Sequence, residues 1–216
     1  MINNFLQNIF DYFKKYNVDV YLVGGGVRDF LLNKDFDDFD FATPFNTKEL
    51  IDLLEIDDYD KFSLKFGTLK TELLGHEVEI TSFREESDYK DHRRPTNIKF
   101  VKDIKKDAAR RDFTINALYL DSSFKVIDFY NGVDDLNNGI IRMIGDPYKR
   151  LKEDPVRILR AIRFSKNLNF KIEYTLLDAI NQNINEINYI SLNRLNKELA
   201  KFNNPNDYYD FISDKL

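Results

Sequence analysis

A glycine turn between an apolar segment and two alternating aspartates does more than any other feature to limit the fold of this chain. The apolar strand predicted at residues 18–23 leads into Gly24-Gly25-Gly26, and a second predicted strand at 38–42 carries Asp38 and Asp40. Glycine has no side chain, so backbone amides in such a turn can come close to phosphate oxygens. Side chains alternate along a strand, so both aspartates share one face, and a cation such as Mg²⁺ relieves their repulsion. The pattern predicts metal-assisted phosphoryl or nucleotidyl transfer.

Each half of this pattern also has a simpler interpretation. A glycine cluster is more often a tight turn, and an isolated Asp-x-Asp pair is usually a solvated strand edge. The dinucleotide-binding fingerprint fits less well, because Asp29 stands where that fingerprint has its third glycine. The chain contains no Gly-Lys-Ser or Gly-Lys-Thr sequence, which excludes a P-loop. The strand, the turn and the aspartate pair together favour a site for metal and triphosphate.

Composition restricts the class of protein. The chain has 216 residues, of which 43% are hydrophobic, enough for one substantial domain or two small ones. It has no cysteine, which excludes disulfides and thiolate zinc sites, and His76 and His92 are too few for a histidine metal cluster. No apolar run is long enough to span a membrane. Residues 1–16 form a predicted amphipathic helix without the layout of a secretion signal, so we expect a cytoplasmic location.

Charge is unevenly distributed along the chain. The formal net charge of −5 argues against a general nucleic-acid binder, which usually carries a basic surplus. A basic segment nevertheless lies between residues 142 and 166 and contains Arg142, Lys149, Arg150, Lys152, Arg157, Arg160, Arg163 and Lys166. Such a segment is usually a solvated helix face, and a surface for nucleotide or RNA is the alternative.

The order of the predicted elements indicates two parts. Up to about residue 140, helices and strands alternate: after the turn come a short helix (27–33), the aspartate strand, a helix from Thr47, and a hairpin of residues 67–74 and 77–83. Residues 84–97 are polar and poor in core-forming side chains, which predicts a mobile loop. Beyond residue 140 the pattern is helical, with further helices at 175–184 and 191–202. We therefore expect a mixed α/β head (1–140) and a helical neck (141–216).

One predicted helix of the neck begins at Asp154-Pro155 and continues toward Leu168. Aspartate is a favoured N-cap and proline suits the first helical position. Arginines follow at every third position (157, 160 and 163), while Ile158 and Ile162 lie on another side and can face the core.

Four motifs in this order resemble class II tRNA nucleotidyltransferases and bacterial poly(A) polymerases. Gly24–Asp29 and the Asp38/Asp40 pair resemble the metal and triphosphate motif of that family. Arg110-Arg111-Asp112, continuing to Asn116, resembles its Arg-Arg-Asp motif, and Glu153-Asp154-Pro155-Val156-Arg157 its Glu-Asp-x-x-Arg motif. The resemblance extends from Tyr21 to about Leu199. It implies a nucleotidyltransferase head of the polymerase beta-like type with a mixed sheet, followed by a small all-helical neck.

The resemblance also implies roles for individual residues. Asp38 and Asp40 would hold Mg²⁺ and be catalytic, with Glu79 as the candidate third carboxylate. Glu79 is explained equally well as an exposed strand residue, and Arg28 either binds triphosphate with Gly24 and Gly25 or pairs with Asp29. The remaining nucleotide contacts would be Arg110 and Arg111 at the sugar and phosphates, Asp112 at the ribose 2′-hydroxyl, and Asn116 at the sugar or phosphates.

Base selection without a nucleic-acid template would fall to Asp154 and Arg157 in this family. A carboxylate accepts a hydrogen bond from the amino group of cytosine or adenine, and arginine donates to ring acceptors. Arg160 would extend the same surface. From the residues alone, a helix cap at Asp154 and a surface arginine at 157 are the simpler interpretation, and the motif favours the functional one.

Within the family, Phe66-Gly67-Thr68-Leu69 resembles CCA-adding enzymes more than poly(A) polymerases. The expected activity is therefore addition of CTP and ATP to the 3′ end of tRNA, complete or partial. A poly(A) polymerase and a non-catalytic nucleotide-binding remnant are the alternatives. Relatives continue into further RNA-binding domains, and in the late motif at 191–199 Asn193 replaces a glutamate. Three alternatives follow: a reduced CCA-adding enzyme, an enzyme that adds only CC or only A, or a subunit for which a partner or an oligomer supplies RNA binding.

Overall fold

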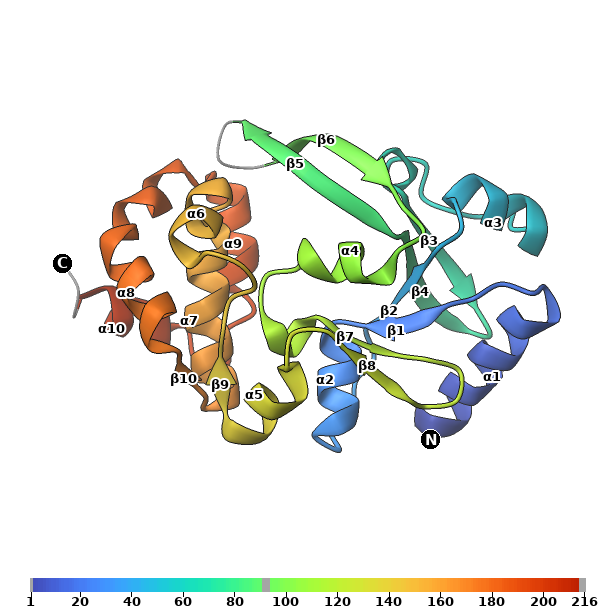
Figure 1. Ribbon diagram of the computed structural model, residues 1–216, viewed down its shortest axis with the longest axis horizontal. Coiled ribbons are helices and arrows are strands. Elements are labelled where there is room, and N and C mark those ends of the chain that lie inside the picture. Colours follow the sequence, from blue (N-terminus) through green and yellow to red (C-terminus); the bar gives the residue numbers. More distant parts are fainter. Residues whose placement is uncertain (1, 91–93, 214–216) are drawn as a thin grey trace. The chain divides into compact units, whose positions relative to one another are not determined.

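The computed structural model describes residues 2–90 and 94–213. The chain divides into two compact units (Figure 1). The first comprises Met1–Glu86, Ile98–Arg111 and Asn116–Tyr130, and the second comprises Ser87–Asn97, Asp112–Ile115 and Asn131–Leu216. The domain boundary predicted after residue 140 stays a prediction. His92 lies outside the described residues.

A six-stranded sheet forms the centre of the first unit, with the strand order β3-β4-β2-β1-β7-β8. Strands β2 and β4 are parallel and the other neighbours are antiparallel, which confirms the predicted mixed sheet. The strands are β1 (Tyr21–Val23), β2 (Phe39–Thr43), β3 (Thr68–Leu73), β4 (His76–Ser82), β7 (Leu118–Leu120) and β8 (Val126–Asp128).

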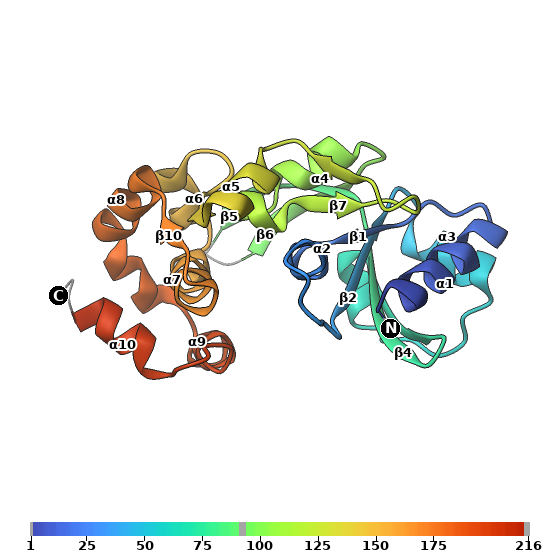
Figure 2. The same ribbon diagram turned by 90° about the horizontal axis from the view of Figure 1, so that it is seen from below.

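Helices cover both faces of this sheet (Figure 2). They are α1 (Ile2–Lys15), α2 (Gly25–Leu31), α3 (Thr47–Leu54) and α4 (Ile104–Ala109), with the 3-10 helix η1 (Ser63–Phe66). The 3-10 helix η2 (Thr114–Asn116) contains residues of both units. The amphipathic pattern of α1 buries Phe10 and Phe13, whose rings lie 6.1 and 6.3 Å from that of Phe41 in β2. Burying such side chains is the main favourable contribution to folding.

The opposite face of the sheet packs on α4. Ala108 of α4 belongs to one buried cluster with Val23, Ala42, Phe83 and Tyr119. Because side chains alternate along β2, Asp40 lies on this α4 face, whereas its neighbours Phe39 and Phe41 point to the other face. The packing of the sheet thus sets which face carries the predicted catalytic carboxylate.

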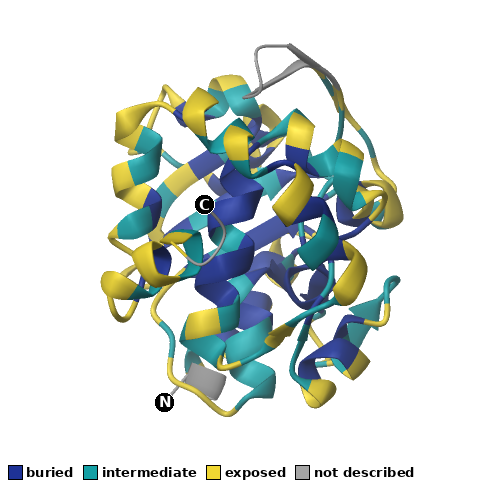
Figure 3. Cartoon of the chain, turned by 90° about the vertical axis from the view of Figure 1, so that its left-hand side faces the viewer, coloured by how far each residue is buried: buried dark blue, intermediate teal, exposed yellow. Residues whose placement is uncertain are grey.

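The second unit is mostly helical, as expected. Its helices are α5 (Gly132–Asn138), α6 (Pro147–Glu153), α7 (Val156–Leu168), α8 (Tyr174–Gln182), η3 (Ile184–Tyr189), α9 (Leu192–Leu199) and α10 (Asn206–Ser213). Helix α7 contacts α6, α9 and α10, and most of its residues are buried (Figure 3). The unit is not all-helical, because β9 (Ile140–Ile141) and β10 (Lys171–Ile172) form a short parallel pair.

One local prediction is wrong. The segment predicted as a loop at 84–97 forms strands β5 (Arg84–Lys90) and β6 (Arg94–Phe100), which pair as a separate two-stranded sheet. Among its described side chains, Glu85 has a charged partner instead of a core contact, since it pairs with Lys106 at 2.9 Å. Of the two interpretations of the basic segment, a solvated helix face does not describe Arg157 and Arg163 of α7, which are 7% and 9% exposed.

Candidate active site

The glycine turn has a backbone conformation that requires glycine. Gly24 has φ 67° and ψ −131°, a region that residues with a Cβ rarely enter. A Cβ at Gly24 would lie 3.8 Å from Nη1 of Arg111, and one at Gly25 would lie 3.5 Å from Nη2 of Arg28. Two guanidinium groups therefore lie against the turn, where they can attract an anion.

Carboxylates lie in a row across neighbouring strands of the same unit. Asp40 of β2 is in register with Glu79 of β4, and Glu79 is in register with Lys70 of β3, with which it forms an ion pair. Asp38 directly precedes β2 and is exposed. Burial, followed by the charges of Asp38 and Glu79, raises the pKa of Asp40 to about 6, against the opposing effects of Arg111 and Lys70. Asp40 is thus held where a nearby cation would favour its charged form.

Oxygen ligands of this kind fit a hard divalent cation. Mg²⁺ is commonly held by one or two carboxylates, and phosphate oxygens and water complete its shell. Asp38 and Asp40 could supply those two carboxylates. Within residues 2–90 and 94–213, no group of three or more carboxylate or imidazole side chains forms a ready-made metal site.

Arg28 has contacts that fit both of its predicted roles. It lies at the glycine turn, and it also pairs with Asp29. Its Nε and Nη2 donate to the two carboxylate oxygens of Asp29 at 2.9 and 2.8 Å. Its Nη1 donates to Oδ1 of Asn116 at 3.0 Å. A predicted phosphate contact and a predicted sugar contact, 88 positions apart in the chain, are therefore joined directly.

Asp107 organises the arginines of the Arg-Arg-Asp motif. Its carboxylate accepts from Nε of Arg110 at 2.8 Å, from Nη2 of Arg111 at 3.2 Å and from the hydroxyl of Tyr119 at 2.6 Å. Burial would raise the pKa of Asp107, but the charges of Arg110 and Arg111 outweigh burial and lower it to about 2. Asp107 is thus ionised throughout the physiological range.

The third residue of the motif has its own partner in the second unit. Asp112 accepts from Nε of Arg160 at 2.5 Å through one oxygen, and from the backbone N–H of Phe113 at 2.8 Å through the other. Arg160 was expected to extend the surface of Asp154 and Arg157, and the structure places it against Asp112. The ribose-binding candidate is therefore held in place by α7.

Asp154 lies at the break between α6 and α7. Its Oδ1 accepts from the backbone N–H of Val156, the first residue of α7, at 3.2 Å, although the N-cap position is Pro155 and not Asp154 as predicted. Both oxygens of the same carboxylate also accept from Nη2 of Arg194, at 3.0 and 2.8 Å. Arg157 donates to the carbonyl of Arg150 at 2.7 Å and to Glu153 at 3.1 Å. These contacts orient the two predicted base-contacting side chains.

Three residues of these networks were missed at the sequence level: Asp107, Tyr119 and Arg194. A signal existed for Asp107, because it precedes Arg110 and Arg111 by three and four positions, the spacing of ion pairs on a helix. Tyr119 and Arg194 gave no such local signal, since their partners are distant in the chain.

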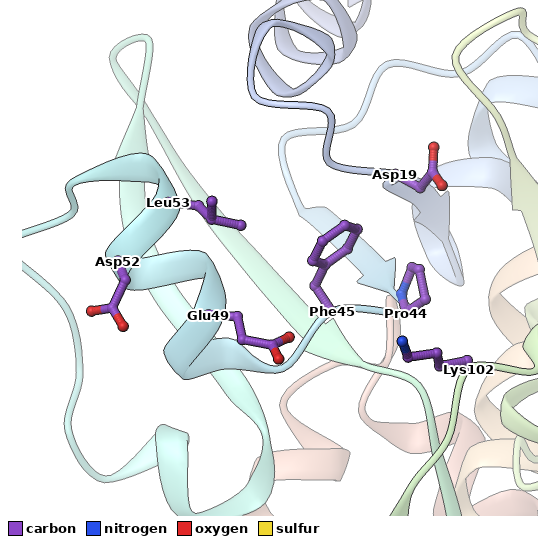
Figure 4. Close-up of a pocket in the computed structure, with 7 residues that line it drawn as sticks. All are labelled: Asp19, Pro44, Phe45, Glu49, Asp52, Leu53 and Lys102. Atoms are coloured by element: carbon purple, nitrogen blue, oxygen red, sulfur yellow. The ribbon is translucent and has the colours of Figure 1, made fainter.

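One cavity of the first unit contains no predicted site residue. It has a volume of about 600 Å³ and is lined by Asp19, Pro44, Phe45, Glu49, Asp52, Leu53 and Lys102 (Figure 4). No helix in the described part of the chain is long and apolar enough to cross a membrane.

Comparison with known proteins decides the family. Residues 20–142 match the Poly A polymerase head domain, over more than half of the chain. A CCA-adding enzyme of Staphylococcus haemolyticus is 38% identical over 198 residues. The chain belongs to the family of class II tRNA nucleotidyltransferases and poly(A) polymerases, which share this head domain. The resemblance inferred from the four motifs is thereby confirmed.

Solved structures of this family share the fold. The CCA-adding enzyme of Bacillus stearothermophilus in complex with CTP aligns with a TM-score of 0.80 and 32% identity, over 90% of this chain and 47% of that one. The Thermotoga maritima enzyme complexed with tRNA aligns with a TM-score of 0.77 and 29% identity, over 99% of this chain and 50% of that one. The Staphylococcus match covers 92% of this chain and 49% of the relative. The chain thus spans about half the length of the relatives it matches.

Proposed function

We propose that this chain transfers CMP and AMP from CTP and ATP to the 3′ end of tRNA, completing or repairing the CCA end. The 3′-hydroxyl oxygen of the RNA attacks the α-phosphorus of the nucleotide, a phosphodiester bond forms and pyrophosphate leaves. The class of reaction follows from family membership, and the similar proteins are CCA-adding enzymes.

The observation that carries the proposal is the register of Asp40 and Glu79 on neighbouring strands of one sheet face. The guanidinium of Arg111, at the glycine turn, acts electrostatically on the same Asp40 carboxylate. Carboxylates that can hold a cation thus accompany arginines that can bind phosphate. Nucleotidyl transfer requires both, because charge must be neutralised on the triphosphate and on the attacking oxygen.

Asp38 and Asp40 are the residues that would hold Mg²⁺, with Glu79 as the third carboxylate. When bound, Mg²⁺ lowers the pKa of a hydroxyl and stabilises charge on phosphate oxygens. We assign triphosphate binding to Arg28, Arg110, Arg111 and the turn at Gly24 and Gly25. Asp112 would accept a hydrogen bond from the ribose 2′-hydroxyl, and Asn116 would contact the sugar or phosphates.

We assign base selection to Asp154 and Arg157. Cytosine and adenine both present an amino group next to a ring acceptor, so one carboxylate and one guanidinium can recognise either base. Arg194 supports the assignment, because it fixes the Asp154 carboxylate that would accept from the amino group.

The test is a nucleotide-addition assay with purified protein and Mg²⁺. Transcripts of tRNA ending before CCA, after C and after CC would be offered CTP, ATP or both, with Asp40→Ala as the inactive control. Orderly growth to a CCA end is the expected result. Addition that stops after CC, or that adds only A, would mark a specialised member of the family.

Three results would contradict the proposal or its metal site. Long A tails on any RNA would favour poly(A) synthesis, the second activity in the family. Binding of CTP without incorporation would favour a nucleotide-binding protein that requires a partner subunit or has lost catalysis. Full activity of Asp40→Ala would show that the metal site is wrongly assigned.

A further inference from the structure

Asp107 is a buried carboxylate that accepts hydrogen bonds from several residues. Its side chain is 0% exposed. Oδ1 accepts from the backbone N–H of Arg84 at 3.1 Å and from Nε of Arg110 at 2.8 Å. Oδ2 accepts from Arg111 and from the hydroxyl of Tyr119. All the acceptor capacity of the carboxylate is thus in use.

Arg111 is held on one edge by a closed triangle of hydrogen bonds. Its Nε donates to the Tyr119 hydroxyl at 2.8 Å and its Nη2 to Asp107 at 3.2 Å, while the Tyr119 hydroxyl donates to Asp107 at 2.6 Å. The guanidinium also lies 4.9 Å from the centre of the Tyr119 ring. Because the guanidinium is a rigid plane, fixing Nε and Nη2 also fixes the direction of Nη1.

That direction leads to the glycine turn. Nη1 of Arg111 lies 3.8 Å from the place of a Cβ on Gly24. An arginine on a flexible side chain would lose rotamer entropy on binding an anion here, whereas one already fixed loses less. Buried ion pairs contribute little net stability, because desolvation offsets their attraction. The network is therefore better explained by what it orients than by what it stabilises.

We propose that Asp107 and Tyr119 are positioning residues, which hold Arg111 so that its Nη1 meets the triphosphate of a bound nucleoside triphosphate at the Gly24 turn. This inference rests on the proposed function for the identity of the ligand. Neither residue touches the nucleotide: Tyr119 acts through Arg111, and Asp107 acts through Arg111 and, to a smaller extent, through Arg110. Loss of either one releases an edge of the guanidinium and weakens nucleotide binding.

The experiment is a double-mutant cycle of Asp107→Asn and Arg111→Ala, read by the KM for CTP and ATP and by the Kd for CTP from calorimetry. We expect Asp107→Asn to raise both constants about tenfold and to leave the KM for tRNA unchanged. In the Arg111→Ala background the same change should have a smaller effect, because only its contact with Arg110 is left to lose. Equal effects in both backgrounds would overturn the proposal.

Two further variants keep the test independent of folding. Tyr119→Phe removes only the hydroxyl and should raise the Kd for CTP about threefold. Asp135→Asn is the matched control, because Asp135 is also a buried carboxylate, bonded to Thr114 and Arg142. It should lower thermal stability without changing the Kd. An equal rise of the Kd in Asp135→Asn would show that general destabilisation is the cause and would overturn the proposal.

The positioning role and the proposed function can fail separately. If the wild-type chain binds CTP but adds nothing to RNA, and Asp107→Asn weakens that binding, the positioning role stands and the activity is wrong. If the wild-type chain adds nucleotides and the variants bind CTP like the wild type, the activity stands and the positioning role is wrong.

Discussion

Asp40 is a carboxylate whose charged form is disfavoured in the folded chain. Burial and the neighbouring charges of Asp38 and Glu79 disfavour its ionised form. A group whose pKa is higher in the folded state than in the unfolded state lowers stability when it is ionised. Its cost is therefore fully present above pH 6 and disappears as the pH falls toward 4.

Replacing Asp40 by asparagine should stabilise the metal-free protein at pH 8. The shift of its pKa from 3.8 to about 6 corresponds to a gain of up to about 3 kcal/mol in the free energy of unfolding. Urea unfolding in the presence of a chelator, at pH 8 and pH 4, measures this. The gain should be absent at pH 4 and for the exposed control Asp37→Asn. A gain of equal size at both pH values would contradict the assigned cause.

Arg194 offers a second test at the residue scale, because it supplies both side-chain hydrogen bonds to Asp154. Arg194→Ala should reduce discrimination against UTP and GTP by roughly tenfold, within the range of one base contact. The measurement is kcat/KM for all four nucleotides. Lys197→Ala, an exposed change in the same helix α9, should leave the ratios unchanged. Unaltered ratios in a folded Arg194→Ala protein would rule out this role.

The junction of η1 with β3 shows how one element depends on close packing. Gly67 has φ +72°, and a Cβ there would lie 2.2 Å from Cε1 of Phe100. Two separate costs therefore meet at this glycine, a left-handed backbone and a clash with a ring of β6.

Gly67→Ala should lower the free energy of unfolding by about 2–4 kcal/mol. Gly75→Ala is a close control, since Gly75 has φ +80° with nothing within 4 Å of its Cβ position. It should cost only about 1 kcal/mol, the backbone contribution alone. Adding Phe100→Ala to Gly67→Ala should recover part of the loss. Equal costs at the two glycines would mean that the clash is relieved by movement of Phe100.

Ion pairs within the chain determine how much positive charge is left for binding RNA. Five arginines of the basic segment at 142–166 form ion pairs with carboxylates of the chain, namely those at 142, 150, 157, 160 and 163. Together with the net charge of −5, this pairing leaves little positive charge for an RNA backbone.

Binding of tRNA to this chain should therefore depend weakly on salt. We expect log K to fall against log salt concentration with a slope of magnitude below about 3, because only a few phosphates are neutralised. Fluorescence anisotropy with labelled tRNA between 50 and 200 mM salt gives the slope. A slope of magnitude near 6 or more would contradict this prediction. It would require a larger basic surface than these ion-paired arginines leave.

The residue types and their spacing were sufficient to predict the family, the mixed α/β head and the helical part that follows. They were sufficient because hydrophobic periodicity, glycine turns and alternating aspartates are local patterns, written within a few neighbouring positions. The same patterns predicted α1, the short helix after the turn and the placement of Asp40 opposite the apolar face of β2.

Such local patterns could not predict contacts between segments that are distant in the chain. The polar stretch at 84–97 lacked an apolar face and so predicted a loop, yet β5 and β6 pair, and residues such as Glu85 find partners in α4. The arginines of α7 carried the signature of a solvated face, yet Glu198, 35 positions away, pairs with buried Arg163. Only the folded chain brings these opposite charges together, because a side chain's partner is chosen by packing in space and not by spacing along the sequence.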